Sequence, residues 1–238
     1  MRVLTLNAWG TNGPPARQSI LLSALRKLDA DILCLQEAAL PDLLQSLSYS
    51  TCIHSDESGL AILSRFPALA HRTITYPVVS PLEPYRRQAL LVELDIGSFP
   101  LWAVSTHLSW KAADGATRLA QVENLLELVK GLAGPLMIAG DFNSTVAEAP
   151  VQRILQSGFL DLFGTLHPGE AGITWDNQNP FIQSHSVKFP DRRIDYLFLR
   201  KEPSSRLRPT GCEIICDLPN AEGLHPSDHY GVLATFSP

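Results

Sequence analysis

The amino-acid sequence predicts an α/β protein, in which either one mixed β-sheet is covered by helices or two packed sheets carry helices outside. Two observations predict this class. Short apolar runs of strand length are spread along all 238 residues, and stretches with apolar residues at helical spacing lie between some of them. No low-complexity linker or shift in composition divides the chain, so we expect a single domain over residues 1–238.

The predicted strands are short runs of apolar residues bounded by turn-forming residues. They are Val3–Leu6, Ile32–Leu35, Leu60–Leu63, Ala89–Leu94, Leu101–Val104, Leu136–Ala139, Ile194–Leu199 and Val232–Phe236. Between His71 and His107 one strand pattern follows another, with a turn at Asp95-Ile-Gly-Ser98, which favours hairpins and antiparallel pairing. The proline-rich stretch from Tyr76 to Tyr85 is expected to form a surface loop.

Three stretches have apolar residues at the spacing of a helix. Ser19–Leu28 and Arg118–Lys130 carry leucines three and four residues apart, and Gly131 is a natural end for the second helix. A third helix is expected from about Ala149 to Gln156 and ends before Gly158.

The composition is that of a globular protein, with 45% hydrophobic and 18% charged residues, which excludes disorder as the main state. The formal net charge of −5 and the pI near 5.8 are opposite to the balance of proteins that coat nucleic acid or anionic membranes. The four cysteines form no CxxC pair, and no apolar run has the length of a signal peptide core or a membrane span. We therefore expect a soluble, reduced, cytoplasmic protein.

Polar residues that can do chemistry gather where the predicted strands begin or end. They are Asn7, Glu37, His107, Asp141, Asn143, Asp195, Asp228 and His229. Each alone has an ordinary structural explanation as a turn former, a helix cap, a half-buried histidine or, for Asp195 beside Arg192 and Arg193, an ion pair. Together they supply oxygen ligands for Mg²⁺ or Mn²⁺ and two imidazoles for proton transfer. The sequence has no HExxH, zinc-type Cys/His spacing, Walker A loop or GxSxG elbow.

The order of the short motifs along the chain resembles the endonuclease/exonuclease/phosphatase, or deoxyribonuclease I-like, superfamily. The motifs are Leu6-Asn7, Leu35-Gln-Glu37, Ser64-Arg-Phe-Pro67, Thr106-His-Leu108, Gly140-Asp-Phe-Asn143, Arg193-Ile-Asp-Tyr196 and Ser227-Asp-His229. Members of that superfamily include deoxyribonuclease I, apurinic endonucleases, inositol polyphosphate 5-phosphatases and neutral sphingomyelinases. The resemblance implies a four-layer α/β/β/α sandwich of two mixed β-sheets flanked by helices. It also implies a divalent-metal-dependent phosphoric ester hydrolase.

The same resemblance implies which residues hold the metal. Glu37, with Asn7 beside it, would bind the cation that bridges to the scissile phosphate, and Asp228 would lie at or near this ion. The expected cation is Mg²⁺, with Mn²⁺ as the alternative. Some DNA-repair members carry an acid shortly after the first Asn, where this chain reads Asn7-Ala-Trp9, so one and two metal ions both stay open.

Catalytic roles carry over to five residues. Asp141 and Asn143 would orient or activate the attacking water, and His107 would contact the phosphate from the opposite side. His229 would contact a phosphate oxygen as proton donor or electrophile, while Asp195 would fix its tautomer and raise its basicity. Phosphate ester hydrolysis requires charge neutralisation, an aligned water and help for the leaving oxygen, and this set can supply all three.

Four residues are candidates for substrate binding. Trp175 lies in a Thr-Trp-Asp segment similar to that of sphingomyelinase-like and tyrosyl-DNA phosphodiesterase-like members, and Phe181 follows in the same loop. Trp175 either offers an aromatic face to the substrate or packs under its own loop. Arg87 would meet a second phosphate or stand in a solvated turn, and Arg118 would line the cleft at the start of a helix.

The leading hypothesis is a Mg²⁺-dependent phosphodiesterase for a small or lipid head-group substrate, similar to sphingomyelinases, because the chain is acidic and compact. The alternative is a nuclease or phosphodiesterase acting on nucleic-acid ends, which a basic, aromatic-lined groove leading to Asp141 would favour. A third hypothesis is a catalytically silent binding module of the same fold. The oligomeric state is left open.

Overall fold

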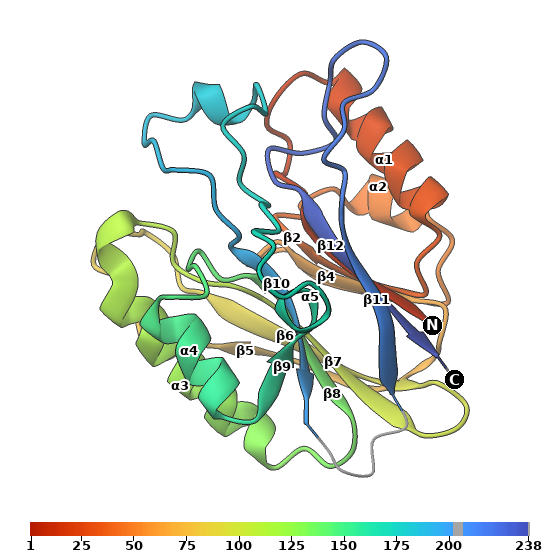
Figure 1. Ribbon diagram of the computed structural model, residues 1–238. Coiled ribbons are helices and arrows are strands. Elements are labelled where there is room, and N and C mark those ends of the chain that lie inside the picture. The colour runs from red at the N-terminus through yellow and green to blue at the C-terminus, as the bar shows by residue number, and fades with distance from the viewer. Residues whose placement is uncertain (202–206, 238) are drawn as a thin grey trace.

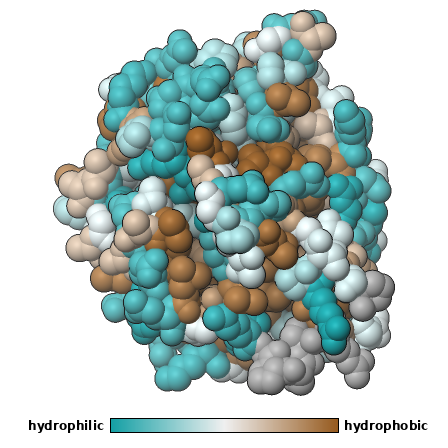
Figure 2. Space-filling model, viewed as in Figure 1, coloured by the Kyte–Doolittle hydropathy of each residue, from teal (hydrophilic) through white to brown (hydrophobic). Residues whose placement is uncertain are grey.

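The computed structural model describes residues 1–201 and 207–237 and has the predicted four layers (Figure 1). Two six-stranded mixed β-sheets pack face to face, and helices cover the two outer faces. The four-layer α/β/β/α sandwich is therefore confirmed. Within the described ranges, every helix is too short or too polar to span a bilayer. On the face drawn in Figure 2, polar residues cover most of the periphery and apolar residues surface in separate patches.

The first sheet has the strand order β11-β12-β1-β2-β4-β3. Its strands are β1 (Arg2–Asn7), β2 (Ile32–Gln36), β3 (Thr51–Ser55), β4 (Leu60–Ser64), β11 (Arg208–Ile215) and β12 (Gly231–Ser237). β1 and β2 pair in parallel, and the other neighbours pair antiparallel. β1 and the C-terminal β12 are neighbours in the middle of the sheet, so both ends of the chain lie close together (Figure 1).

The second sheet has the strand order β5-β6-β7-β8-β10-β9. Its strands are β5 (Ala68–Thr75), β6 (Gln88–Asp95), β7 (Pro100–His107), β8 (Leu136–Asp141), β9 (Phe159–Asp161) and β10 (Asp195–Arg200). β7 and β8 pair in parallel, and the other neighbours pair antiparallel. The hairpin between β6 and β7 turns where the sequence predicts it, with the Gly97 N–H donating to Asp95 Oδ1 at 2.9 Å.

Helices α1 (Ala16–Leu28) and α2 (Pro41–Gln45) lie over the first sheet, and α3 (Gly115–Lys130) and α4 (Ala149–Gln156) lie over the second (Figure 1). A short α5 (Leu162–Leu166) and the 3₁₀ turns η1 (Ala112–Asp114) and η2 (Ile182–Ser184) occur in connections. The α4 bounds agree with the prediction, whereas α1 and α3 each begin three residues earlier than predicted.

Continuous apolar strands follow from burial on both faces of each sheet. In β2, Ile32 and Cys34 face the second sheet, whereas Leu33 and Leu35 pack with α1 and α2. Four strands lie outside the eight predicted runs, β3, β5, β9 and β11, and each is an edge strand of its sheet. Edge strands bury less apolar surface, so they lack the continuous apolar runs by which the central strands are predicted.

A buried polar bridge joins the two sheets near the ends of their central strands. Gln36 on β2 donates its side-chain N–H to Ser105 Oγ on β7 at 3.0 Å, and also to Thr5 Oγ1 on β1 at 3.2 Å. Because all three side chains are inaccessible to solvent, their hydrogen bonds hold the sheets in one relative position. The polar strand ends of the two sheets therefore face each other in a fixed arrangement.

The loop from Tyr76 to Tyr85 lies at the surface but is anchored from below. The Tyr76 hydroxyl lies 2.8 Å from Thr106 Oγ1, and Ser80 donates to the Asp114 carboxylate at 2.7 Å. Tyr76, Ser80 and Glu83 are buried, so the expectation of a surface loop holds for the residues between and after these anchors. The loop thus forms a fixed wall beside the strand ends.

Gly140, near the end of β8, is required by the close approach of β7. Its φ is +151°, and a Cβ at this position would lie 2.0 Å from the carbonyl oxygen of Thr106 on the parallel neighbour.

We expect Gly140→Ala to lower the free energy of unfolding by at least about 2 kcal/mol in urea denaturation, because the strands must separate. Gly131→Ala is the control, since no atom lies within 4 Å of its added Cβ. Equal stability of the two variants would contradict this account.

Candidate active site

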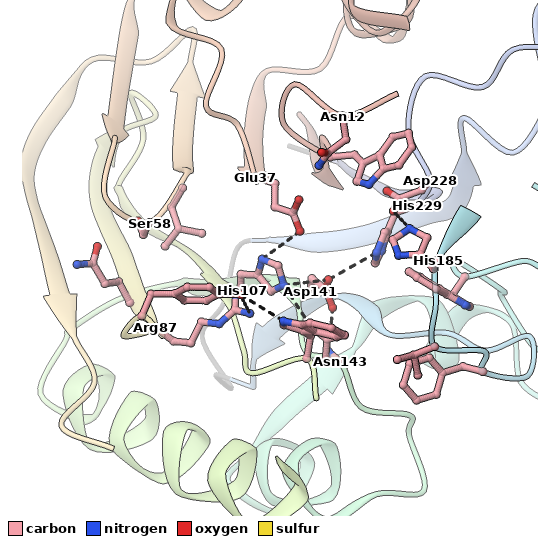
Figure 3. A pocket seen from close by; sticks show the side chains of 18 of the residues that line it. Asn12, Glu37, Ser58, Arg87, His107, Asp141, Asn143, His185, Asp228 and His229 are labelled. Carbon is pink, nitrogen blue, oxygen red and sulfur yellow. Dashed lines mark hydrogen bonds and ion pairs between the residues drawn. The ribbon is translucent and has the colours of Figure 1, made fainter. Parts of the chain in front are cut away.

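The eight polar residues predicted at strand ends meet at one edge of the two sheets. Parallel pairing brings the carboxyl ends of β1 and β2 together, with Asn7 opposite Gln36, and those of β7 and β8, with His107 opposite Asp141. On the antiparallel β10, Asp195 lies opposite Asp141. Figure 3 shows Glu37, His107, Asp141 and His229 pointing toward one another. This edge opens into a cavity of about 390 Å³.

Asp141 lies at the centre of the hydrogen-bond network and is 1% exposed. Its Oδ1 accepts the backbone N–H of Asn143 at 2.8 Å, and its Oδ2 accepts from Asn7 Nδ2 at 3.1 Å. The nearest imidazole nitrogens are His107 Nε2 at 3.3 Å and His229 Nε2 at 3.7 Å. Burial, followed by the charge of Asp195, raises the pKa of Asp141 to about 7. A carboxylate in this state is a competent proton acceptor near neutral pH.

His229 is paired with a fully buried carboxylate. Its Nδ1 lies 2.9 Å from Asp195 Oδ2, which leaves Nε2 directed toward Asp141. Burial alone would lower the pKa of His229, but the charges of Asp195 and Asp141 outweigh it and hold this pKa well above its ordinary value. His229 therefore carries a proton at neutral pH and can donate it from Nε2.

His107 stands in the opposite protonation state. Burial, followed by the charges of Arg87 and His229, keeps its pKa well below the ordinary value of a histidine. Its Nε2 lies 3.2 Å from Asn143 Nδ2, and its Nδ1 lies 3.9 Å from Glu37 Oε1. Asn143 is held in place because its Nδ2 also donates to the carbonyl of Leu108 at 3.1 Å. The site thus combines a neutral and a protonated imidazole.

The residues expected to hold the cation form an acidic group at the mouth of the network. The Glu37 carboxylate accepts from Asn7 Nδ2 at 3.2 Å, and Asn7 Oδ1 accepts the Trp9 N–H at 3.0 Å, so Asn7 bridges Glu37 and Asp141. Burial and the charge of Asp228 raise the pKa of Glu37. Mutually repelling carboxylates with hard oxygen donors fit a divalent cation.

A second group of possible ligands lies deeper. Ligand atoms of Asp141, Asp195 and His229 all lie within 4.8 Å of one another and are buried. Within this group, His229 Nδ1 and Asp195 Oδ2 already contact each other at 2.9 Å. Glu37 is less enclosed, since its side chain is 37% exposed, and so is the more accessible carboxylate for an entering cation.

The four predicted substrate-binding residues occupy different positions. Trp175 lines the cavity and is 7% exposed, with its ring edge-on to that of His229 at 5.1 Å between centroids. Arg87 also lines the cavity, but its guanidinium donates to the Glu83 carboxylate at 2.9 and 3.1 Å. Phe181 packs on Trp9, with ring centroids 5.0 Å apart, and thereby supports a cavity-lining ring.

Arg118 is directed away from the cavity. Its guanidinium donates to Ser144 Oγ and to the carbonyls of Ser109 and Lys111 at 2.8 to 3.0 Å. Only 3% of the residue is exposed. The structure therefore gives Arg118 the position of a brace between α3 and the loops after β7 and β8, and not that of a cleft residue.

Arg17 is a residue of the site that the sequence analysis missed. It is fully buried, and its guanidinium donates to five backbone carbonyls. These belong to Ala8, Trp9, Gly10, Asn12 and Pro226. Arg17 therefore ties the loop after β1 to the loop that carries Asp228. The available signal was a charge on the apolar face of α1, in line with Leu21 and Leu25.

His185 is the second residue that was missed. Its Nε2 lies 2.9 Å from Asp228 Oδ2, and it lines the cavity from the loop after η2. Asp228 is thus held from the cavity side by an imidazole, while Ser227 Oγ donates to the Asn7 carbonyl at 2.6 Å. No local pattern marks His185, because the contact joins segments 43 residues apart.

A sequence model of the Endonuclease/Exonuclease/phosphatase family matches residues 4–229. The chain belongs to this family, as the order of its motifs predicts. The family places it among hydrolases that include nucleases and phosphodiesterases, and the mixed sheets agree with the fold of this class.

Two curated relatives illustrate the range of similarity. Protein angel from Drosophila melanogaster is 30% identical over 178 residues, which cover 61% of this chain and 48% of that protein. Exodeoxyribonuclease from Bacillus subtilis (strain 168) is 24% identical over 226 residues, which cover 81% of this chain and 86% of that protein. The chain thus spans about half the length of the Drosophila relative.

Solved structures share the fold over the whole chain. TDP2 from D. rerio, complexed with a single-strand DNA product, gives a TM-score of 0.83 at 22% identity and covers 100% of this chain and 99% of that chain. TDP2 from C. elegans gives a TM-score of 0.77 at 20% identity, covering 100% and 75%. These identities show a common fold.

Replacement of Arg17 tests its role as a clamp between the two loops. We expect Arg17→Lys to lower the free energy of unfolding by about 1–3 kcal/mol, because an ammonium group cannot satisfy five carbonyls. Arg26→Lys on the same helix is the control, since Arg26 is exposed and its guanidinium donates to the Ser46 carbonyl. Chemical denaturation of both variants measures the effect. A loss of stability in Arg26→Lys as large as in Arg17→Lys would contradict the clamp.

Proposed function

We propose that the protein is a Mg²⁺-dependent phosphodiesterase that hydrolyses a phosphodiester at or near a nucleic-acid end. The observation that carries the substrate class is the chemistry of the cavity walls. Aromatic and basic side chains flank the acidic centre from two sides, which is the arrangement that single strands and strand ends require.

The first wall comes from the loop before β6 and the loop after β7. Tyr85 and Arg86 line it together with Trp110, whose indole N–H donates to the Tyr85 hydroxyl at 3.2 Å. The ammonium of Lys111 lies 3.8 Å from the Trp110 ring centroid. Aromatic faces next to cations bind bases and phosphates in the same groove.

The second wall is formed by the loop after β1 and the segment between α5 and β10. Trp9, Trp175 and Phe189 line it, with Arg192 above the Phe189 ring. The protein is acidic overall, and Arg86, Arg87 and Arg192 supply positive charge in the cavity beside the reacting centre. This distribution supports binding of a short stretch of strand and does not require a long basic surface.

The reaction follows from the positions of the side chains. Hydrolysis forms a bond from a water oxygen to phosphorus and breaks the bond to the leaving oxygen. Asp141 is positioned to accept the proton of the water, with Asn143 orienting it, and His229 donates from Nε2 to a phosphate or leaving oxygen. When bound at Glu37, a divalent cation would neutralise charge on the phosphate.

The substrate class is tested by a paired assay of the protein with Mg²⁺ and with EDTA. One arm offers short DNA with free or blocked ends, and the other offers sphingomyelin in mixed micelles. We expect turnover of DNA with Mg²⁺ only, and a loss of at least about 100-fold in Asp141→Asn and His229→Ala, with circular dichroism showing that both variants are folded. Turnover of the lipid alone would replace the nucleic-acid proposal with the sphingomyelinase-like hypothesis. Full activity of either variant would remove the assigned chemistry.

The proposed role of Glu37 predicts the response to metal. We expect Glu37→Gln to raise the Mg²⁺ concentration for half-maximal activity at least tenfold and to abolish the rise in melting temperature that Mg²⁺ causes. Glu57→Gln is the matched control, because Glu57 lines the same cavity but accepts from Gln88 Nε2 at 3.0 Å. An identical Mg²⁺ titration of the Glu37 variant and the wild type would exclude Glu37 as a ligand.

A further inference from the structure

Trp175 and Arg192 form an isolated antiparallel bridge in the cavity wall. The Trp175 N–H donates to the Arg192 carbonyl at 2.9 Å, and the Arg192 N–H donates to the Trp175 carbonyl at 3.0 Å. Two residues that exchange both hydrogen bonds stand directly opposite each other, so their side chains project to the same side. Both side chains line the cavity.

The two side chains carry buried donors that lack an acceptor. Among the described residues, neither Trp175 Nε1 nor Arg192 Nε has a hydrogen-bond partner, although both atoms are shielded from solvent. A buried N–H without a partner costs roughly 1–3 kcal/mol. Two such donors on neighbouring side chains at a cavity wall fit an oxygen-rich anion that accepts from both.

The charge of Arg192 is held in place and is not neutralised by an ion pair. Its guanidinium lies 3.7 Å from the Phe189 ring centroid and 5.8 Å from that of Trp175, a stacking that fixes its plane. The other two arginines of the cavity differ: Arg87 is paired with Glu83, and Arg86 is exposed. Of the cavity arginines described here, Arg192 alone is both sheltered and without an ion-pair partner.

The position of the pair separates it from the scissile phosphate. The Trp175 ring lies edge-on to the His229 ring, with 5.1 Å between the centroids, so the pair stands beside the reacting centre. Neither Trp175 nor Arg192 belongs to the hydrogen-bonded set of Asp141, Asn143 and His107. That set already supplies the contacts that the reacting phosphate requires. A further anion site next to it fits a neighbouring phosphate of the same strand.

We propose that Trp175 and Arg192 form a subsite for a second phosphate, adjacent to the scissile phosphodiester. The inference rests on the proposed function, because it names the part of the nucleic-acid substrate that this wall recognises. Arg192 contributes charge and hydrogen bonds, and the Trp175 indole N–H contributes a neutral hydrogen bond.

The kinetic test compares two chromogenic esters that differ by one phosphate. The first is the p-nitrophenyl ester of thymidine 5′-phosphate, and the second is the same ester with an added 3′-phosphate. The measured quantity is the ratio of kcat/KM for the second ester to that for the first. We expect Arg192→Gln to lower this ratio about 10- to 100-fold, since a hydrogen bond to a charged group is lost. Trp175→Phe keeps an aromatic ring and removes the N–H, and is expected to lower the ratio about threefold to tenfold.

Arg72→Gln is the matched control, because Arg72 is exposed on β5 and stacks on Trp102 at 5.8 Å, away from the cavity. Its ratio is expected to stay within about twofold of the wild type. An equal loss on both esters in Arg192→Gln would mean that Arg192 holds the scissile phosphate, and would overturn the second subsite. An unaltered ratio with no loss of kcat/KM on either ester would overturn it as well.

A binding measurement keeps the subsite testable if neither ester is hydrolysed. Calorimetry compares thymidine 3′,5′-bisphosphate with thymidine 5′-monophosphate, on the wild type and on Arg192→Gln. We expect the wild type to prefer the bisphosphate at least tenfold and the variant to lose most of this preference. No preference in the wild type overturns the subsite, whereas preference without hydrolysis of either ester contradicts only the proposed function.

Discussion

Two buried carboxylates stand directly opposite each other on neighbouring strands, and the arrangement of the site depends on how their repulsion is compensated. Asp141 on β8 and Asp195 on β10 are paired in register, and both are almost inaccessible to solvent. His229 lies between them, at 2.9 Å from Asp195 Oδ2 and 3.7 Å from Asp141 Oδ2. A protonated imidazole between two carboxylates offsets their repulsion. Burial, followed by the charge of Asp195, raises the pKa of Asp141 to about 7, so that Asp141 can accept a proton near neutral pH. The proton donor and the proton acceptor are thus consequences of one electrostatic arrangement.

The sheets make this arrangement possible by fixing the register of their central strands. Gly140 lets β7 and β8 approach, and the buried bridge of Gln36 and Ser105 holds the first sheet against the second. The side chains of Asn7 and Glu37 then arrive from the first sheet, opposite Asp141 and His107 from the second. Neither sheet alone carries the complete set, so the packing between the sheets is part of the catalytic geometry.

The sequence predicts what depends on strand ends and motif order, and misses what depends on contacts between distant loops. Apolar runs buried on both faces identify the central strands, and the polar residues that follow these strands identify Glu37 and Asp141 as candidate site residues. Arg87 and Arg118 look equally free in the sequence, because Glu83 and the carbonyls around Arg118 become partners only in the folded chain. The sequence suggests an ion pair between Arg192 and Asp195, because the two residues are close in the chain. In the structure, the Asp195 carboxylate pairs with His229 instead.

The adjacency of β1 and β12 has a consequence for synthesis of the chain. β1 cannot be paired on both sides until β12 has formed, since β12 lies between it and β11. Long-range pairing of this kind delays folding, because the intervening chain must first be ordered. The segment that leads into β12 also carries Asp228 and His229. A nascent chain that stops short of this segment therefore lacks both the strand that completes the first sheet and the imidazole of the site. Completion of the first sheet and completion of the site therefore depend on the same segment.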